Sequence, residues 1–277
     1  MAIVLALISA AAWGISDFFG GTISKRQGPW VTAVAVQLSA LIVTAFAVAV
    51  RGGSPTVEDW AWGAAAGVGV GVGTAFLFRG LAAGRMGIVA PISAIGAAVV
   101  PVAVGLGLGE RPGRYAAIGI AAALPAIWLI ARSSDLAGEQ PSGSGIPDAV
   151  LAGLGFGFGF VCIDRISDGA DLAPFLATQV AALLPVLLVA RTMGEAFWPR
   201  SRSAWAGALI GPLGAGANAC ALWAMQAGML SIVSVVISLY PATTVALAAL
   251  VLRERIHAQQ YVGLALAAAA VALISLP

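Results

Sequence analysis

The chain of 277 residues is too apolar to be a soluble globular protein. Hydrophobic residues make up 60% of it and charged residues only 9%, with a formal net charge of +2. Because a soluble domain carries roughly 25% charged residues, this chain cannot cover a core of its own size with a charged shell. Nucleic-acid binding needs clustered basic side chains, and the chain has a single lysine, Lys25. Lipid is therefore its main solvent, and a nucleic-acid partner is excluded.

Metal and cofactor chemistry finds little support in the composition. The only cysteines, Cys162 and Cys220, lie in apolar stretches, and the only histidine, His257, lies in a short polar break. One histidine excludes a multi-histidine metal site, and two cysteines are too few for a disulfide framework. We expect no metal, no cofactor and no catalytic residue.

Hydropathy predicts an all-α polytopic membrane protein. About 20 apolar residues are needed to cross a hydrocarbon core about 30 Å thick. The first such run contains Trp13 and continues to Ser24, which is too long for a signal peptide, so we interpret it as a retained helix. Ten runs follow one another: 2–24, 30–50, 60–82, 86–108, 114–131, 148–166, 173–193, 204–228, 231–252 and 258–276.

The ten segments form two similar halves. A stretch rich in Ser, Gly and Pro, residues 133–147, separates a first five-helix repeat, residues 1–132, from a second, residues 148–277. An offset of 144 residues (254 − 110) places Glu110-Arg111 on Glu254-Arg255 and also aligns Gly119 with Gly263. Since each half has an odd number of spans, the second enters the membrane from the opposite side. Such inverted repeats are typical of carriers that open a midplane cavity to one side and then to the other.

Several short motifs resemble a known family. They are Trp13-Gly14 in the first span, the turns at Gly109–Arg111 and Arg253–Arg255, Gly119, Gly263 and Pro241. With the two five-span repeats, they make the chain similar to the EamA family of the drug/metabolite transporter superfamily. This resemblance implies a ten-helix carrier of small metabolites or drug-like solutes, with a central cavity lined mainly by spans 1, 3, 4, 6, 8 and 9.

The chain departs from the family pattern in span 4. Members of the family have a proline midway through spans 4 and 9, and Pro241 supplies it in span 9. The matching position in span 4 is Ala97, with Pro91 and Pro101 on either side. The kink of span 4 is therefore expected elsewhere, and the two halves need not open symmetrically.

Asp17 is the clearest charge inside a predicted span. An ionised side chain at the bilayer centre costs roughly 2.5–3.5 kcal/mol on insertion scales, so an interaction must offset it. In one interpretation Asp17 faces the cavity, where it binds a cationic group or takes up a coupling proton. In the other it lies near the interface beside Gly20 and Gly21 and reaches water. The sequence leaves both open.

Further substrate-binding candidates are Trp13, Asn218, Trp223, Gln226 and Tyr240. Asn218 and Gln226 are eight residues apart, so both amides lie on one stripe of span 8. If the stripe faces the cavity, the amides orient the solute, whereas the alternative for them is hydrogen bonding between helices.

Other residues are expected to be structural. We assign Glu110, Arg111, Glu254 and Arg255 to capping or bridging the turns after spans 4 and 9, and Gly119, Gly263 and Pro241 to packing and bending. Glycines at every second position of spans 3 and 6 predict close helix approach. Arg79 either reaches headgroups or turns inward, where an opposite charge such as Asp17 could pair with it.

The sequence thus predicts a secondary transporter in the cell membrane, an exporter in the bacterial inner membrane, that acts as a monomer or homodimer. Its partners would be a small-molecule solute, the lipid bilayer and coupling protons. The alternative is a non-transporting membrane protein, either an assembly partner or an intramembrane enzyme. Alternate loops hold 10 and 4 basic residues, which favours both termini outside, whereas the resemblance implies termini inside.

Overall fold

A computed structural model of the chain describes residues 1–82, 86–131, 145–253 and 255–276, and within these ranges it is helical without a strand. Nine of its segments are long and apolar enough to cross a membrane, and Ala258–Ile274 is a shorter apolar helix. The helices are α1 (Ala2–Gln27), α2 (Pro29–Arg51), α3 (Val57–Ala82), α4 (Met86–Gly107), α5 (Arg114–Ala131), α6 (Ile146–Asp164), α7 (Pro174–Thr192), α8 (Gly211–Gln226), α9 (Leu230–Ile237), α10 (Tyr240–Val251) and α11 (Ala258–Ile274), with short 3₁₀ helices η1 (Asp168–Ala170) and η2 (Ser203–Leu209). The prediction of an all-α polytopic protein is confirmed.

Two predicted spans consist of two helical pieces each. The eighth is η2 followed by α8, and the ninth is α9 followed by α10. The ninth breaks at Ser238 and Leu239, just before Pro241 in the first turn of α10, where a missing N–H costs no helical hydrogen bond. Its counterpart α4 stays one helix although it contains Pro91 and Pro101. The two halves therefore differ in the span where the sequence predicts a difference.

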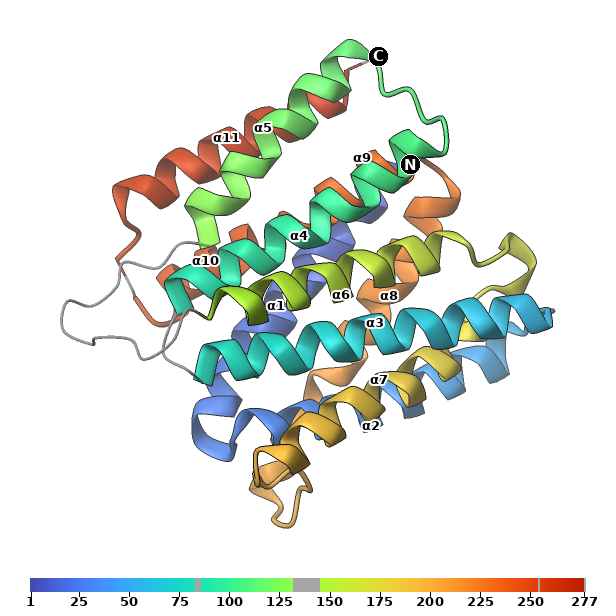
Figure 1. The fold of residues 1–277 in the computed structure, drawn as a ribbon, viewed down its shortest axis with the longest axis vertical. Helices are drawn as coiled ribbons and strands as arrows, with labels where there is room; N and C mark the ends of the chain where they lie inside the picture. The colour runs from blue at the N-terminus through green and yellow to red at the C-terminus, as the bar shows by residue number, and fades with distance from the viewer. Residues whose placement is uncertain (83–85, 132–144, 254, 277) are drawn as a thin grey trace.

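Both ends of the chain lie on the same side of the bundle (Figure 1). We call this side the terminal face, and the opposite side, with Gly28 and residues 193–202, the far face. On the terminal face the loop after α2 is bonded to the loop after α6, because the Ser54 N–H donates to the Gly169 carbonyl at 2.8 Å. The loop after α8 lies against the start of α1, where a Cβ placed on Gly228 would be 2.8 Å from that of Ala2.

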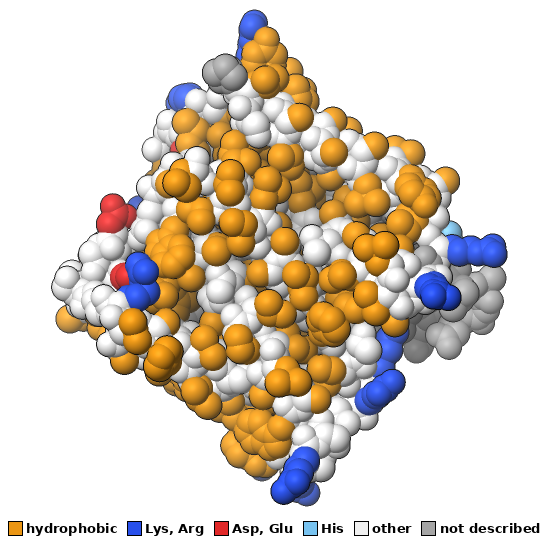
Figure 2. Space-filling model, turned by 180° about the vertical axis from the view of Figure 1, so that it is seen from behind, with side chains coloured by type: hydrophobic (Ala, Val, Ile, Leu, Met, Phe, Trp, Pro, Cys, Tyr) orange, Lys and Arg blue, Asp and Glu red, His pale blue; other side chains and the backbone are white. Residues whose placement is uncertain are grey.

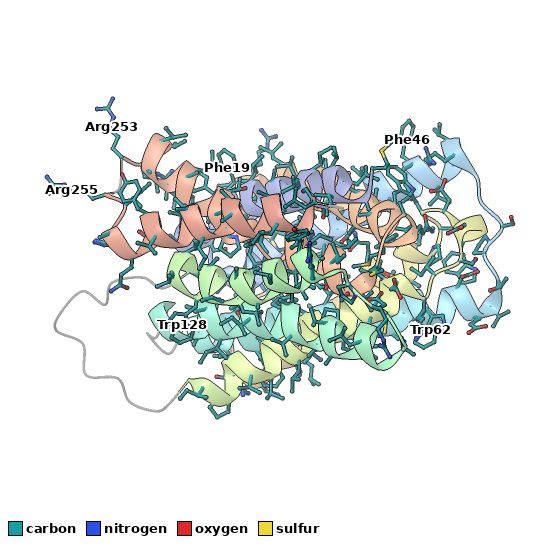
Figure 3. The ribbon with its side chains drawn as sticks, turned by 90° about the horizontal axis from the view of Figure 1, so that it is seen from above. Phe19, Phe46, Trp62, Trp128, Arg253 and Arg255 are labelled. Carbon is teal, nitrogen blue, oxygen red and sulfur yellow. The ribbon has the colours of Figure 1, made fainter. Side chains whose placement is uncertain are left out.

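Basic side chains gather at the far face. Figure 3 shows Arg253 and Arg255 projecting from the far face, at the end of the molecule opposite to Phe46 and Trp62. On the side of the molecule that Figure 2 shows, apolar side chains cover much of the surface between the two faces, as a lipid environment requires. Among the described residues the loops and helix ends of the far face carry Lys25, Arg26, Arg191, Arg200, Arg202, Arg253 and Arg255.

Exchanging the two halves leaves most of the packing unchanged. α1 packs on α8 as α6 packs on α3, and α2 packs on α8 as α7 packs on α3. α4 packs on α6 as α9 and α10 pack on α1, and two further contacts join counterparts to each other, α5 to α11 and α2 to α7. A pattern that survives the exchange is the packing expected of two related five-helix repeats.

Glycines allow the closest of these contacts, as the sequence predicts. On α3, Gly67 lies against the backbone of α7, while Gly69 lies against Gly155 of α6. On α6, Gly153 and Gly96 of α4 lie against each other. Since an added Cβ at any of these positions would meet backbone atoms within 3.0 Å, the helices can approach this closely only without side chains there.

Candidate functional site

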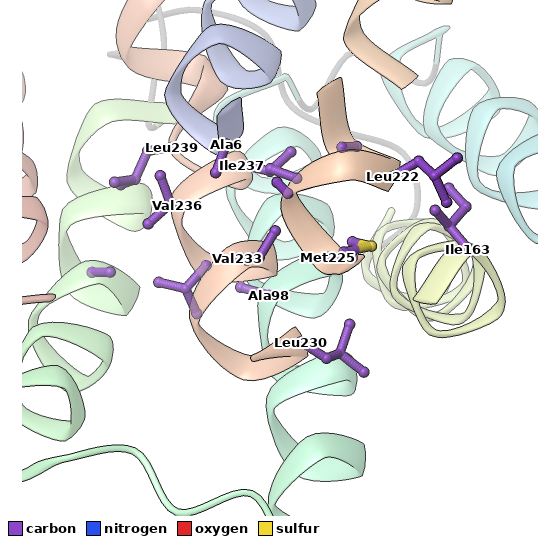
Figure 4. Close-up of a cluster of buried hydrophobic side chains, with 14 of the residues drawn as sticks. Ala6, Ala98, Ile163, Leu222, Met225, Leu230, Val233, Val236, Ile237 and Leu239 are labelled. Carbon is purple, nitrogen blue, oxygen red and sulfur yellow. The ribbon is translucent and has the colours of Figure 1, made fainter. Parts of the chain in front are cut away.

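A cluster of buried apolar side chains packs the seam between the halves toward the terminal face. It joins Ala6 of α1, Ala98 of α4, Ile163 of α6 and Leu222 of α8 (Figure 4). Seven of the eight residues of α9 are buried in or beside it. We call this cluster the terminal seal. The seam is therefore tightly packed at the terminal face, with Ser231 and Ser234 of α9 as buried polar residues beside the cluster.

Glu110 fastens the terminal seal from outside. Its carboxylate oxygens accept hydrogen bonds from the backbone N–H groups of Leu230, at 2.6 Å, and Ser231, at 2.9 Å. These are the first two residues of α9, where N–H groups have no intrahelical partner and a negative charge is favourable. The turn after α4 in the first half thus caps a helix of the second half.

The far half of the same seam is packed differently. The N-terminal half of α4 corresponds to α9, and its C-terminal half corresponds to α10. When the halves are exchanged, a contact between α9 and the C-terminal half of α4 therefore becomes a contact between α10 and the N-terminal half of α4. α4 packs extensively on α9, but in the part of the chain that the structure describes it has no comparable contact with α10. Pro241 is the only buried residue of α10. The seam is therefore closed toward the terminal face and loosely packed toward the far face.

Asp17 lies in this loosely packed half. Its side chain is exposed, although its neighbours in α1, Ser16 and Phe18, are buried. An exposed side chain on the side of α1 that faces α10 favours the inward-facing interpretation of Asp17.

Gly14 brings α1 and α10 together beside Asp17. A Cβ on Gly14 would lie 2.5 Å from the Tyr240 carbonyl oxygen and 2.5 Å from the Thr243 Cβ. The Thr244 hydroxyl donates a hydrogen bond to the Gly14 carbonyl at 3.1 Å. Asp17 follows Gly14 by three residues and therefore projects from nearly the same side of α1.

Trp13 places an unused donor one turn before Asp17. Its indole Nε1 is buried and has no hydrogen-bond partner in the described structure. Buried indole N–H groups usually find an acceptor, so this unused donor makes Trp13 a candidate for a hydrogen bond to a solute. Asp17, four residues later, lies on the same side of the helix.

The two amide candidates on α8, Asn218 and Gln226, are both half-buried. The residue before Asn218, Ala217, accepts a 2.8 Å hydrogen bond from Ser9 of α1. Gln226 has a buried Nε2 that has no hydrogen-bond partner among the described residues. Leu222, between them on the stripe, belongs to the terminal seal. The stripe thus faces the seam rather than lipid.

Trp223 already has a cationic neighbour. The guanidinium of Arg51 lies 4.9 Å from the centre of its ring, and Arg51 Nε donates to Asp171 at 2.8 Å. These contacts join α2, α8 and the loop before α7 at the terminal face. They give Trp223 a structural role that the sequence does not predict.

Arg79 pairs with an acid other than Asp17. Its Nε donates to Asp148 Oδ1 at 3.1 Å, and its guanidinium lies 4.4 Å from the ring centre of Phe76. Because Asp148 is in the first turn of α6, this ion pair joins α3 to α6 near the far face.

The remaining structural candidates lie at turns and crossings. Gly119 of α5 lies against Ala270 and Ile274 of α11, while Gly263 of α11 lies against Ile130 of α5. Arg111 and Arg255 are exposed. The Arg111 guanidinium donates to the carbonyl of Glu110 at 3.0 Å. Glu254 lies outside the described residues.

Sequence reasoning missed one polar anchor. Asp59 is 2% exposed and accepts hydrogen bonds from the N–H and hydroxyl of both Thr56 and Ser167. Thr56 and Asp59 have the spacing of a helix-capping pair, a signal that was available in the sequence. The bond to Ser167, which joins the two halves at the terminal face, had no such signal.

Comparison with known proteins agrees with this architecture. The sequence profile of the EamA-like transporter family matches residues 1–132 and again residues 143–276. The chain belongs to the EamA-like transporter family. Both halves match, so the two repeats of this multi-pass membrane protein each correspond to one EamA unit.

The fold of the EamA-like chain also recurs in solved structures. One, described as "Crystal structure of protein", matches with a TM-score of 0.77 at 16% identity, over 99% of this chain and 96% of the other. This likeness concerns the fold alone. A search of curated proteins finds no match.

Proposed function

We propose that this EamA-like protein is a secondary carrier that moves a small solute by alternating access between inverted repeats. The single observation that carries the proposal is the broken symmetry of its seam. Most of the packing is kept when the halves are exchanged, but within the seam α4 packs on α9 without a comparable contact on α10 among the described residues. A carrier whose halves swap conformations must break its symmetry at that place in either end state. In this conformation the passage opens toward the far face.

The solute site that we propose lies between α1 and α10 in the open half. Asp17, Trp13 and Tyr240 form its centre, and Asn218 contributes an amide from α8. Gln226 lies on the terminal-face side of Leu222, so we propose that it meets the solute only when the terminal face is open. A carboxylate, an orphan indole N–H and a phenol together favour a solute with a cationic or hydrogen-bonding group attached to an apolar body. Asp17 either binds that group directly or carries a coupling proton in exchange for it.

Energy for uphill movement would come from a gradient of protons or of a second solute. Export is the direction that we propose, in the bacterial inner membrane. The alternative, a non-transporting assembly partner or intramembrane enzyme, gains nothing from inverted repeats. In the described residues no group of three or more His, Cys, Asp or Glu side chains is placed to hold a metal ion.

The experiment is counterflow in proteoliposomes. Vesicles are loaded with unlabelled amino acids, amines or cationic dyes in turn and diluted into a trace of the same labelled compound. A carrier accumulates the label transiently above equilibrium, which neither a channel nor a scaffold can do. If no compound of these classes shows protein-dependent counterflow, the proposed function fails.

A further inference from the structure

The terminal half of the molecule contains an apolar cavity that does not include Asp17. It has a volume of about 160 Å³ and lies between α2, the start of α7 and α8. Its walls include Leu172, Phe175, Ala215 and Ala219, and Thr44 is the one polar residue among those that line it. We call this cavity the α2–α8 slot.

The other half of the molecule has an equivalent place, because α2 corresponds to α7 and α8 to α3. The exchange register is fixed by two contacts. Gln37 of α2 is bonded through Nε2 to Gln179 Oε1 of α7 at 2.7 Å, 142 residues on. Gly211 lies against the Val36 carbonyl as Gly67 lies against that of Thr178, again 142 residues on (178 − 36). Positions of α2 therefore map onto α7 with an offset of 142, and those of α3 onto α8 with an offset of 144.

This register maps the walls of the slot onto a filled cluster near the far face. Leu172 corresponds to Trp30, since 172 − 142 = 30, and Ala219 corresponds to Ala75, since 219 − 144 = 75. Trp30 is 2% exposed and packs with Ala75 in the second apolar cluster of the molecule. Val186, the counterpart of Thr44, belongs to the same cluster.

The slot stays open because the counterparts of the residues that fill the equivalent place are smaller or turned away from it. Leu172 stands where Trp30 inserts its indole. Phe78 meets that indole edge-on, with ring centres 5.9 Å apart, whereas its counterpart Leu222 (222 − 144 = 78) packs into the terminal seal. A space bounded by the same helices is therefore plugged by an indole in one half and left open in the other.

We propose that the α2–α8 slot binds a free aromatic ring of the indole type, in the position that Trp30 occupies in the other half. Its apolar walls and volume suit a ring, because apolar cavities of about 150 Å³ in other proteins stay dry and bind benzene-sized molecules. Thr44 is the one residue with a hydroxyl group among those that line the slot, and a hydroxyl can accept a hydrogen bond from an indole N–H. This site goes beyond the proposed solute site, since it uses neither Asp17 nor α10.

The test uses 5-fluoroindole and the whole chain in lipid nanodiscs, with empty nanodiscs as the reference for partitioning into lipid. Fluorine NMR should show saturable binding of one equivalent per chain. Leu172→Trp, which copies the filled half, should abolish that binding. Ala219→Leu, which fills the slot from α8, should do the same, so the test survives if either variant fails to fold.

The matched variant acts on the other half. Trp30→Leu should open a second slot and raise the stoichiometry from one equivalent to two. Wild-type protein that shows no saturable binding, or Leu172→Trp and Ala219→Leu variants that fold and bind as wild type does, would overturn the proposal. A lipid chain that copurifies in the slot and is not displaced by the probe would overturn it too. None of these results depends on counterflow, so the slot and the carrier function fail separately.

Discussion

Glu110, at the turn after α4, caps the first residue of α9, Leu230, with a hydrogen bond of 2.6 Å. The two residues belong to different halves of the chain. In the carrier that we propose, opening of the terminal face would separate them and expose both the carboxylate and the N–H groups to water. The contact would then contribute to the free-energy difference between the two states.

Glu110→Gln should shift the protein toward the state that is open at the terminal face. The amide keeps one acceptor oxygen but loses the charge at the helix N-terminus, a change worth about 1 kcal/mol. A shift of this size changes the ratio of the two states about fivefold. Thiol labelling at a terminal-face cysteine measures it, with Glu58→Gln as control, because Glu58 contacts Trp62 and not α9. Equal labelling of both variants would contradict the role of Glu110.

Gly14→Leu should weaken or abolish the packing of α1 on α10. The added Cβ alone meets the Tyr240 carbonyl and the Thr243 Cβ at 2.5 Å, and overpacking of this kind costs typically 1–3 kcal/mol. The control is Gly20→Leu in the same helix, because nothing lies within 4 Å of a Cβ there. Thermal unfolding in detergent should separate the two. If both variants melt together, α1 and α10 do not pack as described.

Asp17→Asn should leave the fold intact and remove transport or its pH dependence. The side chain is accessible, so losing its charge breaks no packing, but the amide can neither pair with a cation nor carry a proton at neutral pH. Initial rates of counterflow between pH 5 and 8 measure the effect. Asp168→Asn, an exposed acid at the terminal face, should keep the wild-type profile. An unchanged profile in Asp17→Asn would remove this residue from the solute site.

Asp59→Asn should lower the stability of the terminal face. The carboxylate accepts four hydrogen bonds from Thr56 and Ser167. The asparagine amide would place its NH₂ group against some of these N–H and O–H groups, which would then lose their acceptor. A cost of about 1–2 kcal/mol follows from leaving them unpaired. Glu58→Gln, at the adjacent position, is the control in thermal unfolding. No difference between the variants would mean that the loops are held together by other contacts.

Much of the fold could be predicted because the signals are local. Span length follows from bilayer thickness, and the repeat follows from a charged pair and a glycine in register. The break in the ninth span could be predicted from the sequence only in part. Pro241 indicates a bend, but the continuous α4 contains two prolines, so proline alone does not decide where a helix ends.

The candidate site was less predictable because it depends on contacts between the halves. Arg79 pairs with Asp148 and Trp223 stacks on Arg51, partners that are far away in sequence and not related by the repeat. The two-residue difference between the offsets of α2 and α3 hides the equivalence of Trp30 and Leu172 in the sequence. Only the packing of α2 on α8 and of α7 on α3 shows it.

The central claim is that one seam opens to the two faces in turn. Its most direct test is side-specific thiol labelling with Cys162 and Cys220 replaced by alanine and a single cysteine at Val233, in the terminal seal, or at Thr243 of α10. At rest, the cysteine at 243 should react only from the far face, and the one at 233 should not react. During counterflow the cysteine at 233 should react from the terminal face. A cysteine at 233 that stays protected while counterflow proceeds, or one at 243 that reacts from both faces at once, would contradict alternating access.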